Sequence, residues 1–267
     1  MVPSVAVRRH PFVAVLGLLL ALLSTGPAGT QWAGAAAAAP APPPPGPPPP
    51  GTPGLVPPLG PRAWVVVDAD TGNVVDASDD HAPMRPASIS KVLTAIVAIQ
   101  RLPANAVVPV SPVAAGTESV NLGMKAGQVW SFTDTLHAML MLSANDAATA
   151  LAERVSGSRE AFVGAMERTA ADLHLVDRPV LRDPAGLDDQ FSVVGGNFIS
   201  AYDLAIVART ALAIPQIRQI VDLPEYRFTA PDGVVHAIRN VDRGLELYPG
   251  AIGIKTGYTK ADRKSVV

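Results

Sequence analysis

The amino-acid sequence predicts an α+β fold, in which strands and helices occupy different stretches of the chain. Strand-like patterns lie near both ends of the folded part, in residues 63–75 and 226–257. Helical patterns dominate between them, from residue 88 to residue 212. A chain of 267 residues can also bury a sizeable core within one or two domains. Together these observations favour a layered domain with a helical middle.

The start of the chain has the composition of a targeting segment and a linker. Residues 1–39 carry two arginines, then an apolar run at 12–23, then small residues, which is typical of a signal peptide. The run is short for a bilayer span, and an uncleaved anchor through residues 12–39 is the alternative. Residues 40–61 are more than half proline, which favours a disordered or polyproline II linker. We therefore expect export to the cell envelope, periplasm or extracellular face, membrane contact only without cleavage, and a folded domain over residues 62–267.

Charge and composition exclude several classes of protein. The sequence has 21 basic and 23 acidic side chains, which disfavours a surface for nucleic acid. It has no cysteine, and so no disulfide, thiol nucleophile or cysteine zinc site. Its five histidines show no metal-ligand spacing. We therefore expect neither a nucleic-acid partner nor a metal.

The first elements of the folded part are a hairpin and a buried helix. Residues 63–69 form a β-branched run, residues 70–73 supply turn-forming side chains, and a return strand starts at Val74. Pro86 then precedes a helix over residues 88–101. Apolar residues surround most of this helix, which predicts that it is buried in the core.

Capping and turn residues mark the elements that follow. Ser131 and Asp134 resemble a capping box, and Ser158 can cap a further helix. The expected helices cover residues 131–141, 146–155, 158–173 and 200–212, and residues 143–145 separate the first two. A loop is expected at residues 183–188, a strand–turn–strand unit at 226–235 and a last strand at 252–257.

Ser88 and Lys91 are the first candidates for catalysis. They lie three residues apart at the start of the buried helix, so they share one helix face. A serine hydroxyl becomes a good nucleophile when a base removes its proton, and a desolvated lysine can act as that base. The helix N-terminus adds positive potential where an oxyanion would form. The alternative is an N-cap at Ser88 and a solvated Lys91, which the apolar flanks disfavour.

Two further tripeptides carry polar side chains that suit substrate binding. Ser143-x-Asn145 lies between two expected helices, where helix capping alone is the alternative, and a second Ser-x-Asn at residues 119–121 shows that this pattern is not specific by itself. Lys255-Thr256-Gly257 ends the last expected strand, where a cation, a hydroxyl and a glycine suit a substrate carboxylate. An exposed lysine at a strand-to-turn transition is the alternative there.

The order Ser-x-x-Lys, Ser-x-Asn and Lys-Thr-Gly is typical of penicillin-binding proteins and class A β-lactamases. Over residues 62–260 the chain resembles the serine D-alanyl-D-alanine carboxypeptidases, the low-molecular-mass penicillin-binding proteins of peptidase family S11. The similar segments are residues 85–94, 142–148, 183–188, 200–205 and 253–259. The resemblance implies a β-lactamase/DD-peptidase-like fold, with an antiparallel sheet, helices on its faces and a helical subdomain.

The resemblance also implies a mechanism that needs no cofactor. Ser88 attacks the carbonyl of the penultimate D-Ala of a peptidoglycan stem peptide ending in D-Ala-D-Ala, and forms an acyl-enzyme. Lys91 is its general base, and Ser143 relays a proton to the departing D-Ala. Water then releases the shortened peptide, in cell-wall biogenesis and remodelling. β-Lactam antibiotics are expected to acylate Ser88 as covalent inhibitors.

The remaining motif residues have binding roles in this resemblance. Asn145 hydrogen-bonds the substrate amide and helps to place the general base. Lys255 and Thr256 bind the terminal carboxylate, and Gly257 permits close approach of the backbone. The backbone N–H of Tyr258 joins that of the nucleophile in an oxyanion hole.

The sequence departs from the family after the Lys-Thr-Gly motif. Relatives continue with two further strands, whereas this chain ends at Val267, and residues 260–267 lack the usual Ala-Gly step. We expect the last sheet strands to be missing and the Lys255 strand to lack its ladder partner. The chain is then a fragment, a mis-terminated reading frame or an impaired version, with low stability and weak activity as written.

Other functions stay open beside the carboxypeptidase. The motifs do not separate it from a DD-endopeptidase, which cuts cross-links. A class A-like β-lactamase is disfavoured, because the sequence has no Glu-x-x-Leu-Asn element and has Ala144 where that family commonly has Asp. An inactive module that binds penicillin or peptidoglycan is the alternative without catalysis. A secreted structural protein would make the three motifs a coincidence.

Overall fold

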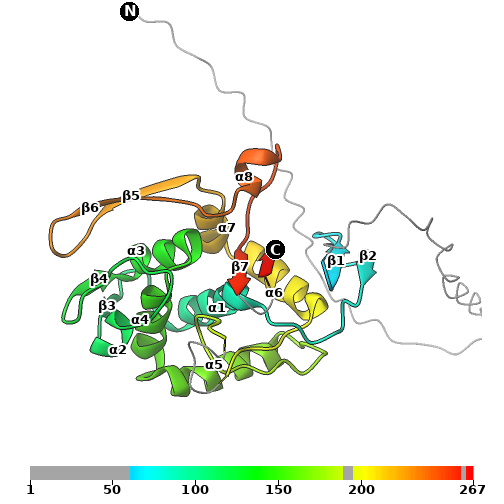
Figure 1. The fold of residues 1–267 in the computed structure, drawn as a ribbon, viewed down its shortest axis with the longest axis horizontal. Helices are drawn as coiled ribbons and strands as arrows, with labels where there is room; N and C mark the ends of the chain where they lie inside the picture. The colour runs from blue at the N-terminus through cyan, green and yellow to red at the C-terminus, as the bar shows by residue number, and fades with distance from the viewer. Residues whose placement is uncertain (1–60, 189–194, 260–262, 267) are drawn as a thin grey trace, which may run out of the picture. The chain divides into compact units, whose positions relative to one another are not determined.

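The computed structural model describes residues 61–188, 195–259 and 263–266, which are coloured in Figure 1. The predicted targeting segment and nearly all of the predicted linker lie outside these residues, so their boundaries stay predictions. Among the described residues no single helix is long and apolar enough to cross a membrane. One pair of helices, Ala201–Ala213 with Pro215–Val221, meets that test together, and it is bent by 101°.

The first described element is the predicted hairpin. β1 (Trp64–Val67) pairs antiparallel with β2 (Val74–Ser78), and Trp64 lies opposite Ser78. The carboxylate of Asp68 accepts hydrogen bonds from the backbone and the hydroxyl of Thr71, which closes the connecting turn. The hairpin packs beside α6 (Ala201–Ala213), as Figure 1 shows.

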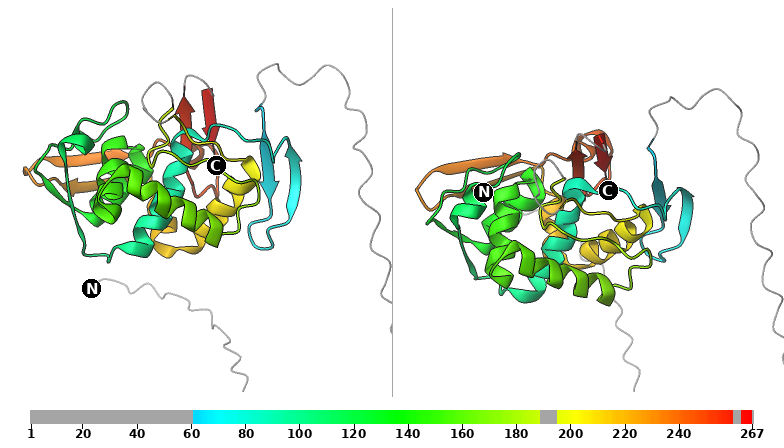
Figure 2. Two further views of the ribbon diagram at one scale, coloured as in Figure 1. Left: turned by 90° about the horizontal axis from the view of Figure 1, so that it is seen from below. Right: turned by 60° about the horizontal axis from the view of Figure 1, so that its bottom comes forward.

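The predicted core helix is present and is entered through a short 3₁₀ turn. Pro86 precedes η1 (Ala87–Ser90), which continues into α1 (Lys91–Arg101). Every residue of α1 from its start to Ala98 is buried. Helices of the middle region pack on one side of α1 and α6 packs on another, which the views of Figure 2 make visible. The apolar surface around α1 is therefore covered on several sides, as its sequence predicts.

The helical middle contains the predicted helices and several short elements that the sequence pattern did not reveal. The predicted caps at Ser131 and Ser158 are confirmed, because each side chain accepts a hydrogen bond from a backbone N–H of the first helical turn. Ser200 caps the helix that follows it in the same way. The helices are α3 (Phe132–His137), α4 (Asn145–Ser156), α5 (Arg159–Asp172) and α6. The additional elements are β3 (Val107–Pro109), α2 (Pro112–Ala115), β4 (Val129–Ser131) and α7 (Pro215–Val221).

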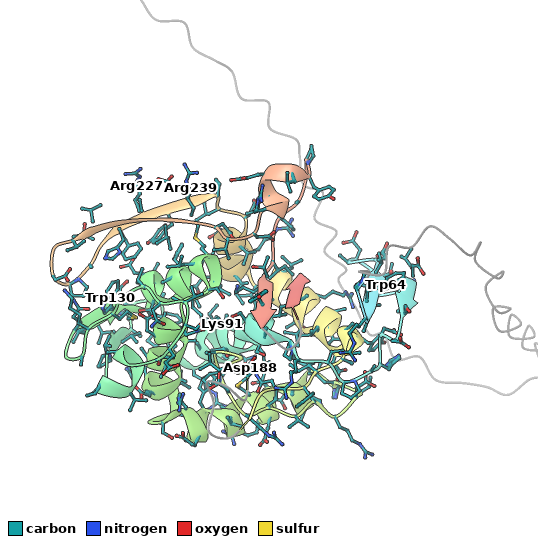
Figure 3. All side chains as sticks on the ribbon, viewed as in Figure 1. Trp64, Lys91, Trp130, Asp188, Arg227 and Arg239 are labelled. Carbon is teal, nitrogen blue, oxygen red and sulfur yellow. The ribbon has the colours of Figure 1, made fainter. Side chains whose placement is uncertain are left out.

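A second hairpin covers this helical part. β5 (Glu225–Thr229) pairs antiparallel with β6 (Val235–Arg239), which confirms the predicted strand–turn–strand unit. Its inner face rests on α3, because the ring of Tyr226 stacks on His137 and its hydroxyl donates to Asp134 at 2.8 Å. Arg227 and Arg239 lie on its outer face in Figure 3.

The last described strands correct two expectations. The strand expected at residues 252–257 is β7 (Thr256–Thr259), and it follows α8 (Gly244–Leu247). Gly253 has a φ of +109°, outside the strand region, so the ladder starts only after it. β7 has a partner, because it pairs antiparallel with β8 (Arg263–Val266). The expectation that this strand lacks a ladder partner is therefore wrong. An unpaired strand is then no reason to expect low stability.

The arrangement of the strands also differs from one continuous sheet. The described strands form four separate antiparallel pairs: β1 with β2, β3 with β4, β5 with β6, and β7 with β8. Helices and small antiparallel sheets together confirm the α+β class. β7 lies against η1, beside the start of α1 in Figure 1, and this contact brings the Lys-Thr-Gly segment to the Ser88 turn.

Candidate active site

Ser88 and Lys91 form the centre of the site. The Nζ atom of Lys91 lies 2.8 Å from the Oγ atom of Ser88, across the junction between η1 and α1. Ser88 is half-buried, whereas Lys91, labelled in Figure 3, is 0% exposed. The caps at this junction are Pro86 and Ser90, and neither uses a side chain. The alternative of an N-cap at Ser88 and a solvated Lys91 is therefore wrong.

The surroundings of Lys91 favour the neutral amine. Burial lowers its pKa well below the ordinary lysine value, and the nearby charge of Lys255 lowers it further. The carboxylates of Asp183 and Asp146 act in the opposite direction, but they do not compensate for burial. Nζ also donates to Asn145 Oδ1 at 2.7 Å and to the Ala185 carbonyl at 2.6 Å. A lysine whose pKa is lowered by burial, and which contacts a hydroxyl, is suited to act as a base in its neutral form.

The Ser143-x-Asn145 segment is placed by a break between two helices. After α3 the chain widens into a π-helical turn, η2 (Ala138–Leu142), and Ser143 then adopts a left-handed conformation with φ +69°. Asn145 accepts from Lys91 with its side-chain oxygen and donates with its nitrogen to the Glu118 carbonyl at 2.9 Å. Ser143 is 8% exposed, and its hydroxyl has no hydrogen bond to the described residues.

The Lys-Thr-Gly segment closes the site from the other side. Gly257 lies so close to η1 that a Cβ atom there would be 2.8 Å from the Pro86 carbonyl oxygen. Lys255 is 1% exposed, which overturns the alternative of an exposed lysine, and its Nζ donates to the Thr256 carbonyl at 2.8 Å. Burial lowers the pKa of Lys255 to about 7, although Asp242 acts in the opposite direction. Tyr258 is exposed on β7.

Several residues that support the site were not singled out from the sequence. The buried carboxylate of Asp146 accepts from the backbone N–H groups of Leu122, Gly123 and Met124, so it anchors the segment beside Asn145. The side chain of Asn197 binds the backbone of the 183–188 loop and the Ser90 hydroxyl. The only sequence signal for these roles is the position of Asp146 directly after the second motif.

The structure therefore brings most of the predicted residues together. Lys91 is in hydrogen-bond contact with both Ser88 and Asn145, and Lys255 is near enough to lower the pKa of Lys91. Among the described residues no group of three or more His, Cys, Asp or Glu side chains is placed to hold a metal ion. In this α+β fold the serine of a Ser-x-x-Lys motif is hydrogen-bonded to the buried lysine of the same motif. This arrangement is typical of the class of serine hydrolases to which penicillin-binding proteins belong.

Comparisons with known proteins identify the family. Residues 56–267 match the peptidase S11 family, described as D-alanyl-D-alanine carboxypeptidase, and the chain belongs to this family. It is 38% identical over 217 residues to the D-alanyl-D-alanine carboxypeptidase DacB2 of Mycobacterium tuberculosis, covering 80% of this chain and 72% of that protein. It is 28% identical to DacF of Bacillus subtilis over 74% of this chain, and it spans only 51% of that relative.

Solved structures agree with the family. The crystal structure of a D-alanyl-D-alanine carboxypeptidase from Mycobacterium tuberculosis matches with a TM-score of 0.72 and 36% identity, covering 78% of each chain. The crystal structure of a peptidoglycan synthesis regulatory factor, PBP3, from Streptococcus pneumoniae matches with a TM-score of 0.68 and 28% identity, over 74% of this chain and 60% of that one. The DD-peptidase fold expected from the sequence is therefore confirmed.

Proposed function

We propose that this protein is a serine-type D-Ala-D-Ala carboxypeptidase, which removes the terminal D-Ala from peptidoglycan stem peptides through an acyl-enzyme. The observation that carries this proposal is the fully buried Lys91 amine, 2.8 Å from the Ser88 hydroxyl, in a chain of the S11 family. A neutral amine at that distance can remove the hydroxyl proton as the oxygen attacks.

Acylation starts at Ser88. Its Oγ forms a bond to the carbonyl carbon of the penultimate D-Ala, and its proton passes to the lone pair of Lys91. The negative charge on the substrate oxygen is stabilised by the backbone N–H groups of Ser88 and Tyr258. One such donor typically contributes about 3 kcal/mol of transition-state stabilisation.

Departure of the terminal D-Ala completes the first half of the reaction. The carbon–nitrogen bond breaks, and the proton held by Lys91 returns through the Ser143 hydroxyl to the leaving nitrogen. Asn145 binds the substrate amide, while Lys255 and Thr256 bind the terminal carboxylate. Water then attacks the ester on Ser88 and releases the shortened peptide. This chemistry needs no metal or cofactor, and β-lactams acylate the same oxygen.

The buried position of Lys255 makes substrate recognition dependent on pH. Its pKa is about 7, so it is charged below that pH and loses its charge above it. We expect kcat/KM for a peptide with a free carboxylate to fall above about pH 7, approaching ten-fold per pH unit. Lys255→Arg keeps its charge throughout, because arginine is always protonated in proteins. The alkaline fall should vanish in that variant, and a fall that persists in it would mean that another group is responsible.

Release of D-Ala tests the proposed function directly. The full chain is incubated with a pentapeptide that ends in D-Ala-D-Ala, and free D-Ala is measured. A fluorescent penicillin in a parallel sample labels the acyl-enzyme, and mass spectrometry locates the adduct. We expect D-Ala release and an adduct on the peptide that contains Ser88. Labelling without release would instead support an inactive penicillin-binding module, and rapid loss of the adduct with hydrolysed penicillin would support a β-lactamase.

The place of the enzyme in the cell follows from the same proposal. Its substrate lies outside the cytoplasmic membrane, so the enzyme must be exported. The apolar run at residues 12–23 and the small residues after it supply the expected signal. Among those small residues, Ala33-Gly34-Ala35 fits the A-x-A pattern of a cleavage site. N-terminal sequencing of protein recovered from the envelope distinguishes cleavage there from a retained anchor.

A further inference from the structure

The three hydrogen-bond partners of Lys91 differ in what they can do. Nζ contacts Asn145 Oδ1, the Ala185 carbonyl oxygen and Ser88 Oγ. The first two atoms can only accept a hydrogen bond, whereas a hydroxyl can also donate one. A neutral amine has two N–H groups and one lone pair. As an ammonium, Nζ donates to all three oxygens. As a neutral amine, donation to the two pure acceptors uses both N–H groups, and the lone pair then remains for the Ser88 hydroxyl.

The Ala185 carbonyl is presented by a tightly held loop. The buried carboxylate of Asp183 accepts from the backbone N–H groups of Ala185 and Leu187, at 2.8 and 3.1 Å. Gly186 has a φ of +73°, and a Cβ atom there would lie 1.9 Å from the Ala87 carbonyl oxygen. The loop therefore lies directly on η1, with no room for a larger residue.

One side chain of α1 itself fastens this loop. The hydroxyl of Thr94 donates to the Pro184 carbonyl at 2.7 Å, and Thr94 is fully buried. Thr94 lies three residues after Lys91, so both side chains leave the same face of α1. Lys91 thus binds the carbonyl of residue 185 while Thr94 binds the carbonyl of the residue before it.

We infer that Thr94 is a positioning residue for the reaction. Its hydroxyl holds the 183–188 loop in the position at which the Ala185 carbonyl points toward the Lys91 amine. The inference rests on the proposed function, because it assigns to Thr94 an effect on the base and none on the substrate. Asn197 supports the same position of the loop, since its side-chain nitrogen donates to the Ser90 hydroxyl and to the Asp183 carbonyl.

This role has a consequence that simple loss of stability does not have. The Ala185 carbonyl stabilises the ammonium form of Lys91 more than the amine, because a hydrogen bond to a charged donor is the stronger one. Moving the carbonyl away should lower the Lys91 pKa. The other charges that act on Lys91 come from Lys255, which lowers its pKa, and from Asp183 and Asp146, which raise it. Substitution at Thr94 removes none of these three charges.

The test compares buried threonines that make matched contacts. Thr94→Val removes the hydroxyl and keeps the shape, Thr94→Ala does so without placing a methyl group against Pro184, and Thr94→Ser restores the donor. Thr135→Val is the control, because Thr135 is also fully buried and donates to a backbone carbonyl, that of Ser131, at 2.7 Å. For each full-length variant, the acylation rate by a fluorescent penicillin is measured from pH 5 to 9, with a thermal melt for folding.

We expect Thr94→Val and Thr94→Ala to acylate about ten-fold more slowly at the plateau, since small misplacements of a reacting group are costly. Their acidic limb should move to lower pH, while Thr94→Ser and Thr135→Val keep the wild-type limb. The thermal melt shows which of Thr94→Val and Thr94→Ala folds. If a folded variant loses rate while the acidic limb of its pH–rate profile stays at the wild-type pH, the inference is overturned and Thr94 is a structural residue. A wild-type chain that is not acylated at all would overturn the proposed function, and this inference with it.

Discussion

A Ser88→Ala variant is expected to release no D-Ala and to form no penicillin adduct, with a loss of about a million-fold in kcat, as in serine hydrolases that lose their nucleophile. The change removes the oxygen atom that bonds to the substrate carbonyl carbon in the proposed mechanism. It leaves the backbone N–H of residue 88 in place, and alanine fits a 3₁₀ turn whose first residue is already Ala87. Free D-Ala and fluorescent labelling are the two measurements.

The control for Ser88→Ala is Ser111→Ala. Ser111 is also half-buried, and its hydroxyl caps α2 by accepting from the Ala114 backbone N–H at 2.9 Å. Losing that cap should cost about 1 kcal/mol of stability and leave the reaction intact. An adduct that still forms on a folded Ser88→Ala protein would place the nucleophile elsewhere and refute the assignment of Ser88.

A Lys91→Met variant is expected to lose between about a hundred-fold and ten-thousand-fold in the acylation rate, the range attributed to general-base catalysis. Methionine keeps the length and flexibility of the buried stem, but it has no amine to accept the Ser88 proton. The change also leaves Asn145 Oδ1 and the Ala185 carbonyl without their donor, so some stability should be lost as well. Stopped-flow acylation by a chromogenic penicillin measures the rate.

Lys125→Met is the matched control for that change. The Lys125 side chain is 72% exposed, and its Nζ pairs with Asp232 at 3.1 Å on the surface of the β5–β6 hairpin tip. An exposed ion pair contributes little to stability, so this variant should acylate at the wild-type rate. If Lys91→Met acylated as fast as Lys125→Met, another base would have to activate Ser88.

Some features of the site depend only on residues close together in the sequence, and these could be predicted. The contact between Ser88 and Lys91 follows from their separation by three residues at the start of one helix. The burial of that helix follows from its nearly uniform apolar surface, and the caps at Ser131 and Ser158 follow from local hydrogen-bond chemistry. The α+β class follows from the order of these local patterns along the chain.

Other features depend on segments that are far apart in the sequence. Asn145 lies 54 residues from Lys91 and Ala185 lies 94 residues from it, and no periodicity in the sequence reveals which carbonyl reaches the amine. The same holds for Thr94 and Asn197, whose side chains look like ordinary polar residues until the 183–188 loop lies against α1. The pairing of β7 with β8 was likewise missed, because hydrogen bonding between two strands depends on which strand edges the fold brings together.

The amino-acid sequence is sufficient to identify the family, the α+β class and the order of the three motifs, because each of these depends on local spacing. The chemistry available to the two lysines depends instead on the folded structure. Lys91 and Lys255 have low pKa values because other segments of the chain exclude water from them. Burial is a property of the packed fold and of no single segment, so only the folded chain turns two ordinary amines into a candidate base and a candidate carboxylate ligand.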